Sequence, residues 1–288
     1  MDAAGALVRI RAAFPELGER HVRRLGEGWA NVCWLGASGL VYRFPTTVAG
    51  RTALPMEAAL LPCLAPALPL AAPVFRHVAA DGSVAAYPLV PGVPLAALAP
   101  GHARALAALL TALHGYPRAR AAALGLPDVS PAAWRARLGA FWAAALADLA
   151  PWWSADDAAR AAGHIAGFLG DETGFAFTPA LIHGDLVPEH LLAEPDTGRL
   201  VGVIDFEDAQ IGDPALDFAG LAQLAAPVLA AYRGPADPGL LGRAAFYRSL
   251  GPLHEMLYGV RSGRPARVRA GLAAWRRGRE GRRGRQGR

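Results

Sequence analysis

Residues 181–209, LIHGDLVPEHLLAEPDTGRLVGVIDFEDA, determine the fold that this sequence predicts, because short apolar runs alternate in them with turns and acidic residues. The runs HLLA (190–193) and LVGVIDF (200–206) flank EPDTGR, whose Pro, Asp and Gly are typical of a tight turn. The pattern predicts a β-hairpin inserted among segments of helical periodicity.

The sequence before this hairpin predicts a small sheet. VCWLGASGLVYRF (32–44) and PVFRHVAADGSVAAYPLV (73–90) each place a Gly-containing turn between two apolar runs, which indicates two further hairpins. Between them, ALPMEAALLPCLAPAL (53–68) predicts a helix, although Pro62 and Pro66 should limit its length.

A Pro- and Gly-rich stretch contains the expected hinge, residues 91–95, and helical periodicity follows it. We therefore expect an α+β protein with a small N-terminal sheet lobe at residues 1–90. A larger, mainly helical C-terminal lobe is expected at residues 96–265. The Arg- and Gly-rich segment 266–288 has too few apolar residues to order itself, so the sequence predicts a disordered tail.

Composition narrows the class of protein. The chain has 288 residues, of which 53% are hydrophobic and 18% charged, as in a globular protein with sizeable cores. Its N-terminus lacks the features of a secretory signal and its apolar runs are too short to span a membrane, so we expect a cytoplasmic protein without a membrane partner. Cys33 and Cys63 are expected to be reduced thiols, because their spacing does not suit a metal site.

The net charge of +5 comes from the end of the chain. The last fourteen residues, WRRGREGRRGRQGR, hold seven arginines and one glutamate, or +6, so the rest carries 5 − 6 = −1. The body of the protein is therefore not a basic nucleic-acid-binding domain, and only the tail could bind a polyanion. All 29 Lys+Arg residues are arginine, so arginine must take any role that chemistry usually gives to lysine.

Three polar groups lie at the strand ends of the predicted insert: Asp185, His190 and Asp205. The hairpin brings the start of HLL beside the end of GVID, so His190 and Asp205 would face one cation together. Oxygen ligands suit Mg²⁺, which keeps waters and substrate phosphates at its remaining positions. Asp185, on the preceding loop, would accept a proton from a substrate hydroxyl. The structural alternative is that Asp185 caps a turn and His190 is a core histidine.

Five pieces of the sequence, in this order, resemble the aminoglycoside phosphotransferase family, small-molecule kinases with a protein-kinase-like fold. They are GEGWANVCWL (26–35), VYRFP (41–45), Glu57 in its helix, HGDLVPEHLL (183–192) and VIDFEDAQIGDP (203–214). The resemblance extends over about residues 20–265, and His190 in EHLL is similar to the 2''-aminoglycoside phosphotransferases and some macrolide kinases. It implies a two-lobed protein-kinase-like fold, Mg²⁺ as cofactor and ATP or GTP as co-substrate.

In the catalytic loops, the resemblance implies that Asp185 is the catalytic base or orienting carboxylate and that His190 and Asp205 are Mg²⁺ ligands. It further implies that three residues support these loops through hydrogen bonds: His183, Asp213 and Asp217.

In the N-terminal lobe, the resemblance implies that Gly26 and Gly28 belong to the loop that covers the nucleotide. Arg43 stands where the family often has a lysine that pairs with the nucleotide phosphates, and it is bulkier than lysine and binds through two N–H groups. Glu57 would be its ion-pair partner, and a solvated helix glutamate is the alternative. Tyr87, by its position before the hinge, would border the base pocket.

A cationic acceptor would need carboxylates. Glu255, in FYRSLGPLHEMLYG (246–259), is the first candidate because that segment resembles a pocket-lining helix of the 2''-type enzymes, and Glu189 and Asp208 come second. Other acids are also available: Asp156, Asp157 and Glu207. Four tryptophans belong to the core or to an apolar wall for a sugar or macrolide: Trp134, Trp142, Trp152 and Trp153.

We therefore expect a monomeric enzyme that transfers the γ-phosphate of ATP or GTP to a hydroxyl of a small cationic molecule, first of all an aminoglycoside antibiotic. A macrolide, choline-like or sugar-like acceptor is the alternative within the same chemistry. A kinase-fold binding protein whose tail binds RNA or another polyanion is the alternative from another class.

Overall fold

The computed structural model describes residues 1–171 and 173–286, and it leaves out the side chains of residue 173 and of residues 279–286. The chain divides into two compact units, which are described one at a time. Unit 1 comprises Met1–Asp128, Ala180–Ile211 and Gln223–Pro235, and unit 2 comprises Val129–Pro179, Gly212–Ala222 and Ala236–Arg288.

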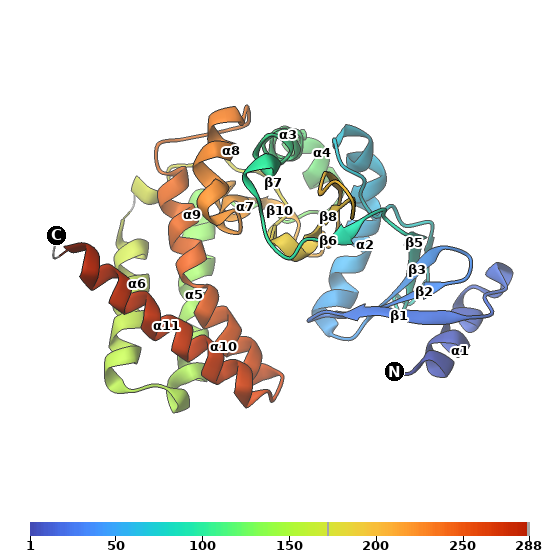
Figure 1. Ribbon diagram of the computed structural model, residues 1–288, viewed down its shortest axis with the longest axis horizontal. Coiled ribbons are helices and arrows are strands. Elements are labelled where there is room, and N and C mark those ends of the chain that lie inside the picture. The colour runs from blue at the N-terminus through green and yellow to red at the C-terminus, as the bar shows by residue number, and fades with distance from the viewer. Residues whose placement is uncertain (172, 287–288) are drawn as a thin grey trace. The chain divides into compact units, whose positions relative to one another are not determined.

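Unit 1 contains a five-stranded antiparallel sheet in the order β1-β2-β3-β5-β4 (Figure 1). Its strands are β1 (Val22–Glu27), β2 (Asn31–Gly36), β3 (Leu40–Pro45), β4 (His77–Val78) and β5 (Ala85–Pro88). Cys33 lies opposite Arg43, which in turn lies opposite Ala85. Both hairpins predicted within residues 32–44 and 73–90 are confirmed.

The two faces of this sheet differ in chemistry, because side chains alternate along each strand. One face packs against α1 (Ala3–Ala13) through alternate apolar residues of β2 and β3: Val32, Trp34, Tyr42 and Phe44. The other face carries Asn31, Cys33 and Arg43, and it lies against α2. A single alternation of apolar and polar residues thus places one core and one polar surface on opposite sides of the sheet.

Helix α2 (Val48–Leu64) is capped by Thr47, whose Oγ1 accepts a hydrogen bond of 3.0 Å from the backbone N–H of Gly50. Of the two prolines expected to limit the helix, only Pro66 lies at its end, since Pro62 is inside it. Four leucines of α2 are at most 1% exposed, and their burial outweighs the poor helix propensity of proline: Leu54, Leu60, Leu61 and Leu64.

The rest of unit 1 positions the loops that the sequence predicts to be catalytic. Its helices are α3 (Ala103–His114), α4 (Arg118–Ala123) and α8 (Ala225–Ala231), and its strands are β6 (Val93–Pro94), β7 (Ala180–Ile182), β8 (Leu191–Ala193), β9 (Leu200–Val203) and β10 (Gln210–Gly212), which ends at the unit boundary. Leu191 lies opposite Val203, which confirms the hairpin predicted from residues 190–206.

The expected hinge is part of a three-stranded sheet in unit 1. Val93 of β6 lies opposite Ala193 of β8, and the three strands have the order β6-β8-β9. Gly92 has φ +104°, and a Cβ on it would lie 2.9 Å from the Ala193 carbonyl oxygen, so only glycine fits this close approach. The segment between the predicted lobes is therefore held by strand pairing.

Unit 2 is built from α5 (Pro131–Leu149), α6 (Ala155–Gly170), α7 (Ala215–Ala219), α9 (Leu240–Ser249), α10 (Gly251–Arg261) and α11 (Pro265–Gln286). Short 3₁₀ turns in the two units are Pro15–Leu17, Ala65–Ala67, Pro100–His102, Ala150–Trp152, Thr173–Phe175, Pro188–His190 and Ala222–Leu224. Of the tryptophans singled out in the sequence, Trp134 and Trp142 are buried, whereas Trp152 is 37% exposed.

Helix α11 corrects the expectation of a disordered tail from residue 266. Val268 and Trp275, seven residues apart on one helix face, are 0% and 2% exposed. A Cβ on Gly271 would lie 2.6 Å from the Pro252 carbonyl oxygen, so glycine lets α11 lie directly on α10 (Figure 1). The prediction of disorder is therefore wrong for residues 266–278, because this apolar stripe buries itself despite the surrounding arginines. Residues 287–288 of the predicted tail lie outside the described residues.

The architecture confirms the predicted α+β class, with a small antiparallel sheet near the N-terminus and a mainly helical remainder. The hairpin of residues 190–206 groups with the N-terminal sheet in unit 1, so the compact units differ from the expected division at residues 90 and 96. Within the described residues, no helix has the length and apolar character needed to cross a membrane.

Candidate active site

The His-Gly-Asp turn follows β7 in unit 1. Gly184 has φ +88°, and a Cβ there would lie 2.5 Å from the Asp208 carbonyl oxygen. Both the backbone conformation and the close approach of the Asp208 backbone therefore require glycine between His183 and Asp185. This glycine lets the two loops of the predicted insert approach each other closely.

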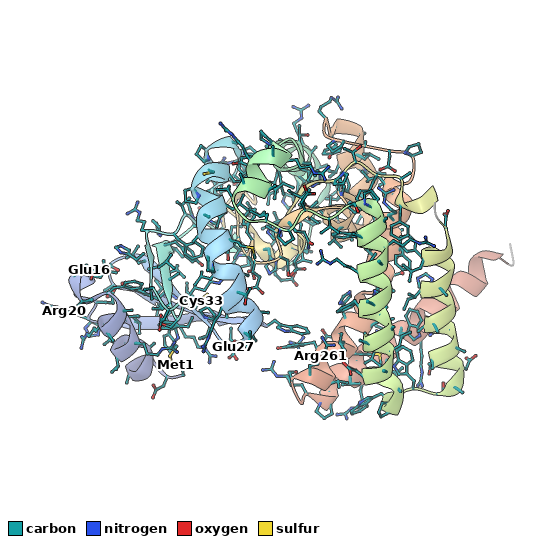
Figure 2. All side chains as sticks on the ribbon, turned by 180° about the vertical axis from the view of Figure 1, so that it is seen from behind. Met1, Glu16, Arg20, Glu27, Cys33 and Arg261 are labelled. Carbon is teal, nitrogen blue, oxygen red and sulfur yellow. The ribbon has the colours of Figure 1, made fainter. Side chains whose placement is uncertain are left out.

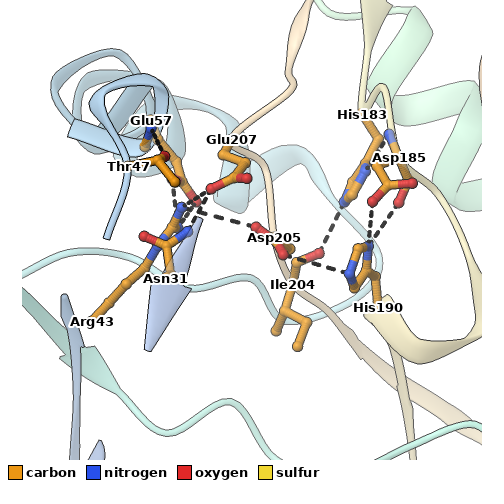
Figure 3. Close-up of polar contacts among 11 residues, drawn as sticks. Asn31, Arg43, Thr47, Glu57, His183, Asp185, His190, Ile204, Asp205 and Glu207 are labelled. Atoms are coloured by element: carbon orange, nitrogen blue, oxygen red, sulfur yellow. Dashed lines mark hydrogen bonds and ion pairs between the residues drawn. The ribbon is translucent and has the colours of Figure 1, made fainter. Parts of the chain in front are cut away.

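His183 joins the same two loops. Its Nδ1 accepts a hydrogen bond of 3.3 Å from the backbone N–H of Asp185, which places the ring proton on Nε2, 2.9 Å from the Ile204 carbonyl oxygen (Figure 3). The side chain is fully buried. These contacts are those expected of a residue that supports the loops, and that role stays a prediction.

His190 has its tautomer set by a backbone group. Its Nδ1 lies 2.8 Å from the Asp185 carbonyl oxygen, which can only accept, so Nδ1 carries the proton. The lone pair of Nε2 is then free, and Nε2 lies 3.5 Å from Oδ2 of Asp205. An imidazole held by an Nδ1–H···O=C bond is a common arrangement in histidines that bind metals through Nε2.

Asp205 and Asp185 approach His190 from two sides. Oδ2 of Asp185 lies 3.6 Å from His190 Nδ1, and the Asp185 side chain is 51% exposed, as a group that must reach a substrate would be. Asp205 has φ +70°, a left-handed conformation that is uncommon for a residue other than glycine. Such strain is often found at functional sites, and here it accompanies a carboxylate placed between His190 and Arg43. The structure thus brings the three predicted residues of the catalytic loops together.

Arg43 is 4% exposed and lies on the polar face of the sheet. Its Nη1 donates to both carboxylate oxygens of Glu57, at 2.8 and 2.6 Å, so the structure pairs these two residues as expected (Figure 3). Burial raises the pKa of Glu57 to about 7, against the opposing effect of Arg43. Although burial alone would lower it, the neighbouring carboxylates, Glu57 first, raise the pKa of Arg43.

Two further residues complete the polar cluster around Arg43, and sequence reasoning did not assign them to it. Oε2 of Glu207 accepts hydrogen bonds from Arg43 Nη2 at 2.8 Å and from Asn31 Nδ2 at 2.5 Å. The sequence suggests Glu207 as an acceptor contact and not as a partner of Arg43. For Asn31, its position two residues from Cys33 on β2 is the sequence signal that places it beside Arg43. Nη2 of Arg43 also lies 3.9 Å from Oδ1 of Asp205.

The other residues predicted for the nucleotide lie near this cluster. Gly26 lies near the end of β1, opposite Cys33, and Gly28 lies in the turn that follows. An added Cβ on either glycine would have nothing within 4 Å, and their role stays a prediction. Tyr87 in β5 is 9% exposed, packs edge-on against Phe75 at 5.2 Å between ring centroids, and has its pKa raised by burial. Cys33, labelled in Figure 2, is a free thiol whose pKa burial raises to about 11.

Two of the acids proposed to bind the acceptor already have arginine partners. In unit 2, Glu255 accepts hydrogen bonds of 3.0 and 3.3 Å from Arg267, and the buried Asp157 accepts two from Arg276. In unit 1, Glu189 is exposed, and loss of hydration raises the pKa of Asp208 to about 6, with the nearby carboxylates acting in the same direction. Contacts to an acceptor stay predictions for all four.

Asp213 is the centre of a buried cluster in unit 2. Its carboxylate accepts hydrogen bonds from Arg243 Nε, from the Tyr247 hydroxyl and from the backbone N–H of Ala215, at 2.7, 2.7 and 3.0 Å. Arg243, which sequence reasoning missed, also donates to Asp237. Asp217 is fully buried as well. These positions are those expected of supporting residues, and the roles of Asp213 and Asp217 stay predictions.

The donor set of the catalytic loops fits a magnesium ion. Among the described residues, no group of three or more His, Cys, Asp and Glu side chains could hold a metal. His190 Nε2 and the Asp205 carboxylate nevertheless provide a lone pair and an oxygen that face each other. Magnesium is usually bound through one or two carboxylates, such as that of Asp205, and fills its remaining positions with water and substrate phosphates. Two ligands are therefore enough for the predicted site.

Fold and site together define a class. A small antiparallel sheet bearing a paired Arg43–Glu57 is followed along the chain by helices and by loops around a hairpin, where Asp185, His190 and Asp205 meet. This is the organisation of a kinase-like phosphotransferase. The chain belongs to the phosphotransferase enzyme family, whose model matches residues 21–255. The resemblance seen in the sequence is confirmed.

Solved structures share the fold. The GDP complex of a mutant aminoglycoside 2'-phosphotransferase-IIIa superposes with a TM-score of 0.85 at 24% identity and covers 98% of this chain and 99% of its own. The macrolide 2'-phosphotransferase MphH from Brachybacterium faecium has a TM-score of 0.71 at 26% identity, with 94% and 97% covered. The predicted protein-kinase-like fold is therefore confirmed.

Similarity to curated sequences is confined to parts of them. The chain is 37% identical to the viomycin phosphotransferase of Streptomyces vinaceus over 106 residues, which are 34% of this chain and 37% of that protein. It is 49% identical over 39 residues to the uncharacterized protein YcbJ of Bacillus subtilis, 14% of this chain and 12% of that one. The matched stretches thus span 37% of the length of the first of these relatives and 12% of the length of the second.

Proposed function

We propose that this protein transfers the γ-phosphoryl group of ATP or GTP to a hydroxyl of an aminoglycoside antibiotic, acting as a cytoplasmic monomer. The observation that carries the proposal is the convergence of Asp185, His190 and Asp205 on one side of the Arg43 cluster within unit 1. A loose phosphoryl-transfer transition state needs positioning and neutralised charge more than covalent chemistry, and this set of residues is suited to both.

Each residue of the set has a role in the proposed reaction. The Asp185 carboxylate accepts the proton of the acceptor hydroxyl, whose oxygen then forms the new P–O bond while the nucleoside diphosphate leaves with the electron pair of the old one. His190 Nε2 and the Asp205 carboxylate would hold Mg²⁺, which neutralises charge on the phosphates when bound. Arg43 would bind a phosphate oxygen, with Glu57 fixing its orientation.

Acceptors of other kinds are separate candidates. The likeness to a macrolide 2'-phosphotransferase and the local similarity to a viomycin phosphotransferase support antibiotics beyond the aminoglycosides. A choline-like or sugar-like metabolite remains a further candidate from the sequence. The Arg-rich end of the chain supports the alternative of a polyanion-binding protein.

An acceptor screen tests the proposal. The purified full chain is incubated with Mg²⁺ and either ATP or GTP, together with one candidate from each class: kanamycin, a macrolide, viomycin and choline. We expect mass spectrometry to detect one added phosphoryl group on kanamycin, and EDTA to abolish the product. Phosphorylation of another candidate alone would reassign the acceptor. Nucleotide binding without any phosphorylated acceptor, together with salt-sensitive binding of RNA, would favour the polyanion-binding alternative.

A further inference from the structure

Glu207 occupies a position where two donors from neighbouring strands meet. Its Oε2 accepts hydrogen bonds from Arg43 Nη2 at 2.8 Å and from Asn31 Nδ2 at 2.5 Å (Figure 3). Both donors project from the polar face of the sheet. Arg43 lies opposite Cys33, and Asn31 precedes Cys33 by two residues on β2, so all three side chains share one face. We call Arg43 Nη2 and Asn31 Nδ2 the donor pair. Two N–H groups that converge on one anionic oxygen would bind a phosphate oxygen equally well.

Of the polar groups of Arg43, only Nη2 has a partner that can be exchanged. Nη1 is held by both oxygens of Glu57, whose side chain is 1% exposed and fixed on α2. Nε is buried and has no hydrogen-bond partner among the described residues. Glu207 contacts Nη2 from a loop, and its side chain is 19% exposed, so it has a route to solvent. A ligand oxygen can therefore reach Arg43 most directly by replacing Glu207.

The charges around Arg43 favour such an exchange. One guanidinium faces three carboxylates, Glu57 and Glu207 in hydrogen-bond contact and Asp205 at 3.9 Å. Bound phosphate oxygens would be repelled by this excess of negative charge if all three carboxylates remained. Asp205 has a cation of its own in the proposed magnesium site, and Glu57 is enclosed. Glu207 is left as the carboxylate that can move away.

We propose that Glu207 is a carboxylate placeholder that occupies the phosphate-oxygen position of the donor pair in the nucleotide-free protein and withdraws when the nucleotide binds. The inference rests on the proposed function and extends it, because it names Glu207 and Asn31 as residues that set nucleotide affinity. Asn31 is a phosphate-binding residue under this proposal. Glu207 is a competitor for the same two N–H groups.

Isothermal titration calorimetry of the full-length chain tests the proposal with tripolyphosphate, ATP and GTP, each without added metal and again with Mg²⁺. Glu207→Gln keeps the shape of the side chain and removes its charge, so we expect tripolyphosphate and the matching nucleotide to bind at least about 10-fold more tightly. The matched control is Glu194→Gln, which alters a partly exposed glutamate paired with Arg199 in the hairpin turn of unit 1. Its affinities should equal those of the unchanged chain.

A second part of the experiment uses Asn31→Ala to test whether Asn31 binds the phosphate oxygen. In the Glu207→Gln background it removes one of the two donors, and we expect it to cancel most of the gain in tripolyphosphate affinity. Glu207→Ala serves if the Gln variant is poorly folded, as judged by its thermal midpoint, because the small side chain cannot reach Arg43 at all. It should also bind tripolyphosphate more tightly than the unchanged chain.

Unchanged or weaker binding of tripolyphosphate by a folded Glu207 variant would overturn the proposal, since a competitor cannot be removed without a gain. In that case the acceptor screen decides separately whether the protein is a phosphotransferase. Conversely, a gain in tripolyphosphate affinity without any phosphorylated acceptor would support the placeholder and contradict the proposed function. The two hypotheses therefore fail through different measurements.

Discussion

The Asp205 loop and the Asp213 loop are only eight residues apart, yet their carboxylates have opposite surroundings. Asp213, in unit 2, is fully buried and accepts hydrogen bonds from Arg243, Tyr247 and a backbone N–H. Asp205, in unit 1, is partly exposed, and the nearest described side-chain nitrogens, His190 Nε2 and Arg43 Nη2, lie 3.5 and 3.9 Å from its oxygens, beyond the length of a charge-assisted hydrogen bond. One carboxylate is satisfied by the protein, and the other is left open.

This difference separates a supporting group from a binding group. A buried carboxylate is stable only when its acceptor positions are filled, as they are around Asp213. A carboxylate whose oxygens are unfilled and reachable can accept a metal, a proton or a donor from a ligand. Asp205 and Asp185 belong to the second kind. Glu207 is intermediate between the two kinds, because its oxygen is filled by Arg43 and Asn31, which could also bind a phosphate.

The largest expected effect concerns Asp185. Asp185→Asn removes the base but keeps the shape of a side chain that is half exposed, so we expect turnover of the phosphorylated acceptor to fall by about 10³-fold while the free energy of unfolding stays within about 0.5 kcal/mol. Steady-state rates and urea unfolding give the two values. Asp196→Asn, in the exposed turn of the same hairpin, is the matched control and should leave both unchanged. Retained turnover in Asp185→Asn would place Asp185 among the turn-capping residues.

Asp213 should respond in the opposite way. Among the described residues, Asp213→Ala leaves the buried Arg243 with only Asp237 as its carboxylate partner and deprives Tyr247 of its acceptor, so the free energy of unfolding should fall by about 3 kcal/mol. Turnover per folded molecule should change little. Asp148→Ala breaks the exposed pair with Arg261, labelled in Figure 2, and should cost less than about 1 kcal/mol. A stable but inactive Asp213→Ala would remove the distinction between the two loops.

The sequence predicted which residues of the two loops lie close together better than it predicted the long-range partners of buried polar residues. The proximity of Asp185, His190 and Asp205 could be predicted because these residues lie on adjacent loops beside apolar strands, and the strand pairing that brings them together is local in sequence. Asn31 and Arg243 were missed because their partners are distant: Asn31 meets a residue 176 positions away, and Arg243 meets Asp213 across 30 positions. Pairings of this kind depend on how the chain packs, which a local pattern does not record.

Helix α11 illustrates the same limit. Its composition indicates disorder, because arginine and glycine dominate residues 275–288. Trp275 is nevertheless buried, and the Arg160 guanidinium lies 4.4 Å from the centre of its ring. Asp157 also accepts hydrogen bonds from Arg276, so arginines of the segment counted as solvated tail are used in packing. Composition averaged over the segment does not record that Val268 and Trp275 are seven residues apart. This spacing places both residues on one face of a helix, so it could have predicted the helix.

The smallest expected effects concern how the stability of the fold depends on pH. They compare a carboxylate of the cluster around Arg243 with one of the loop that carries Asp205. Hydrogen bonds from Arg243 lower the pKa of Asp237, so its ionised form stabilises the fold at any pH above the ordinary value of 3.8, and this contribution is lost as pH falls through the lowered value. The ionised form of Asp208 has the opposite effect and destabilises the fold. Its pKa is raised to about 6, so the folded protein disfavours its charge, and the cost is full above pH 6 and disappears as pH falls toward 3.8.

Urea unfolding in EDTA at pH 8 and pH 4 measures both contributions. At pH 8, Asp237→Asn should destabilise the protein, whereas Asp208→Asn should stabilise it by no more than about 1 kcal/mol, because Asp208 loses only part of its hydration and the remaining water screens its charge. At pH 4 the gain from Asp208→Asn should have nearly vanished, while the loss from Asp237→Asn should persist in part, since Asp237 stays ionised below the pH at which Asp208 is protonated. Equal signs for the two variants at pH 8 would mean that the loop around Asp208 satisfies its carboxylates as fully as the cluster around Arg243 does. The catalytic loops would then need another source for their unfilled acceptor positions.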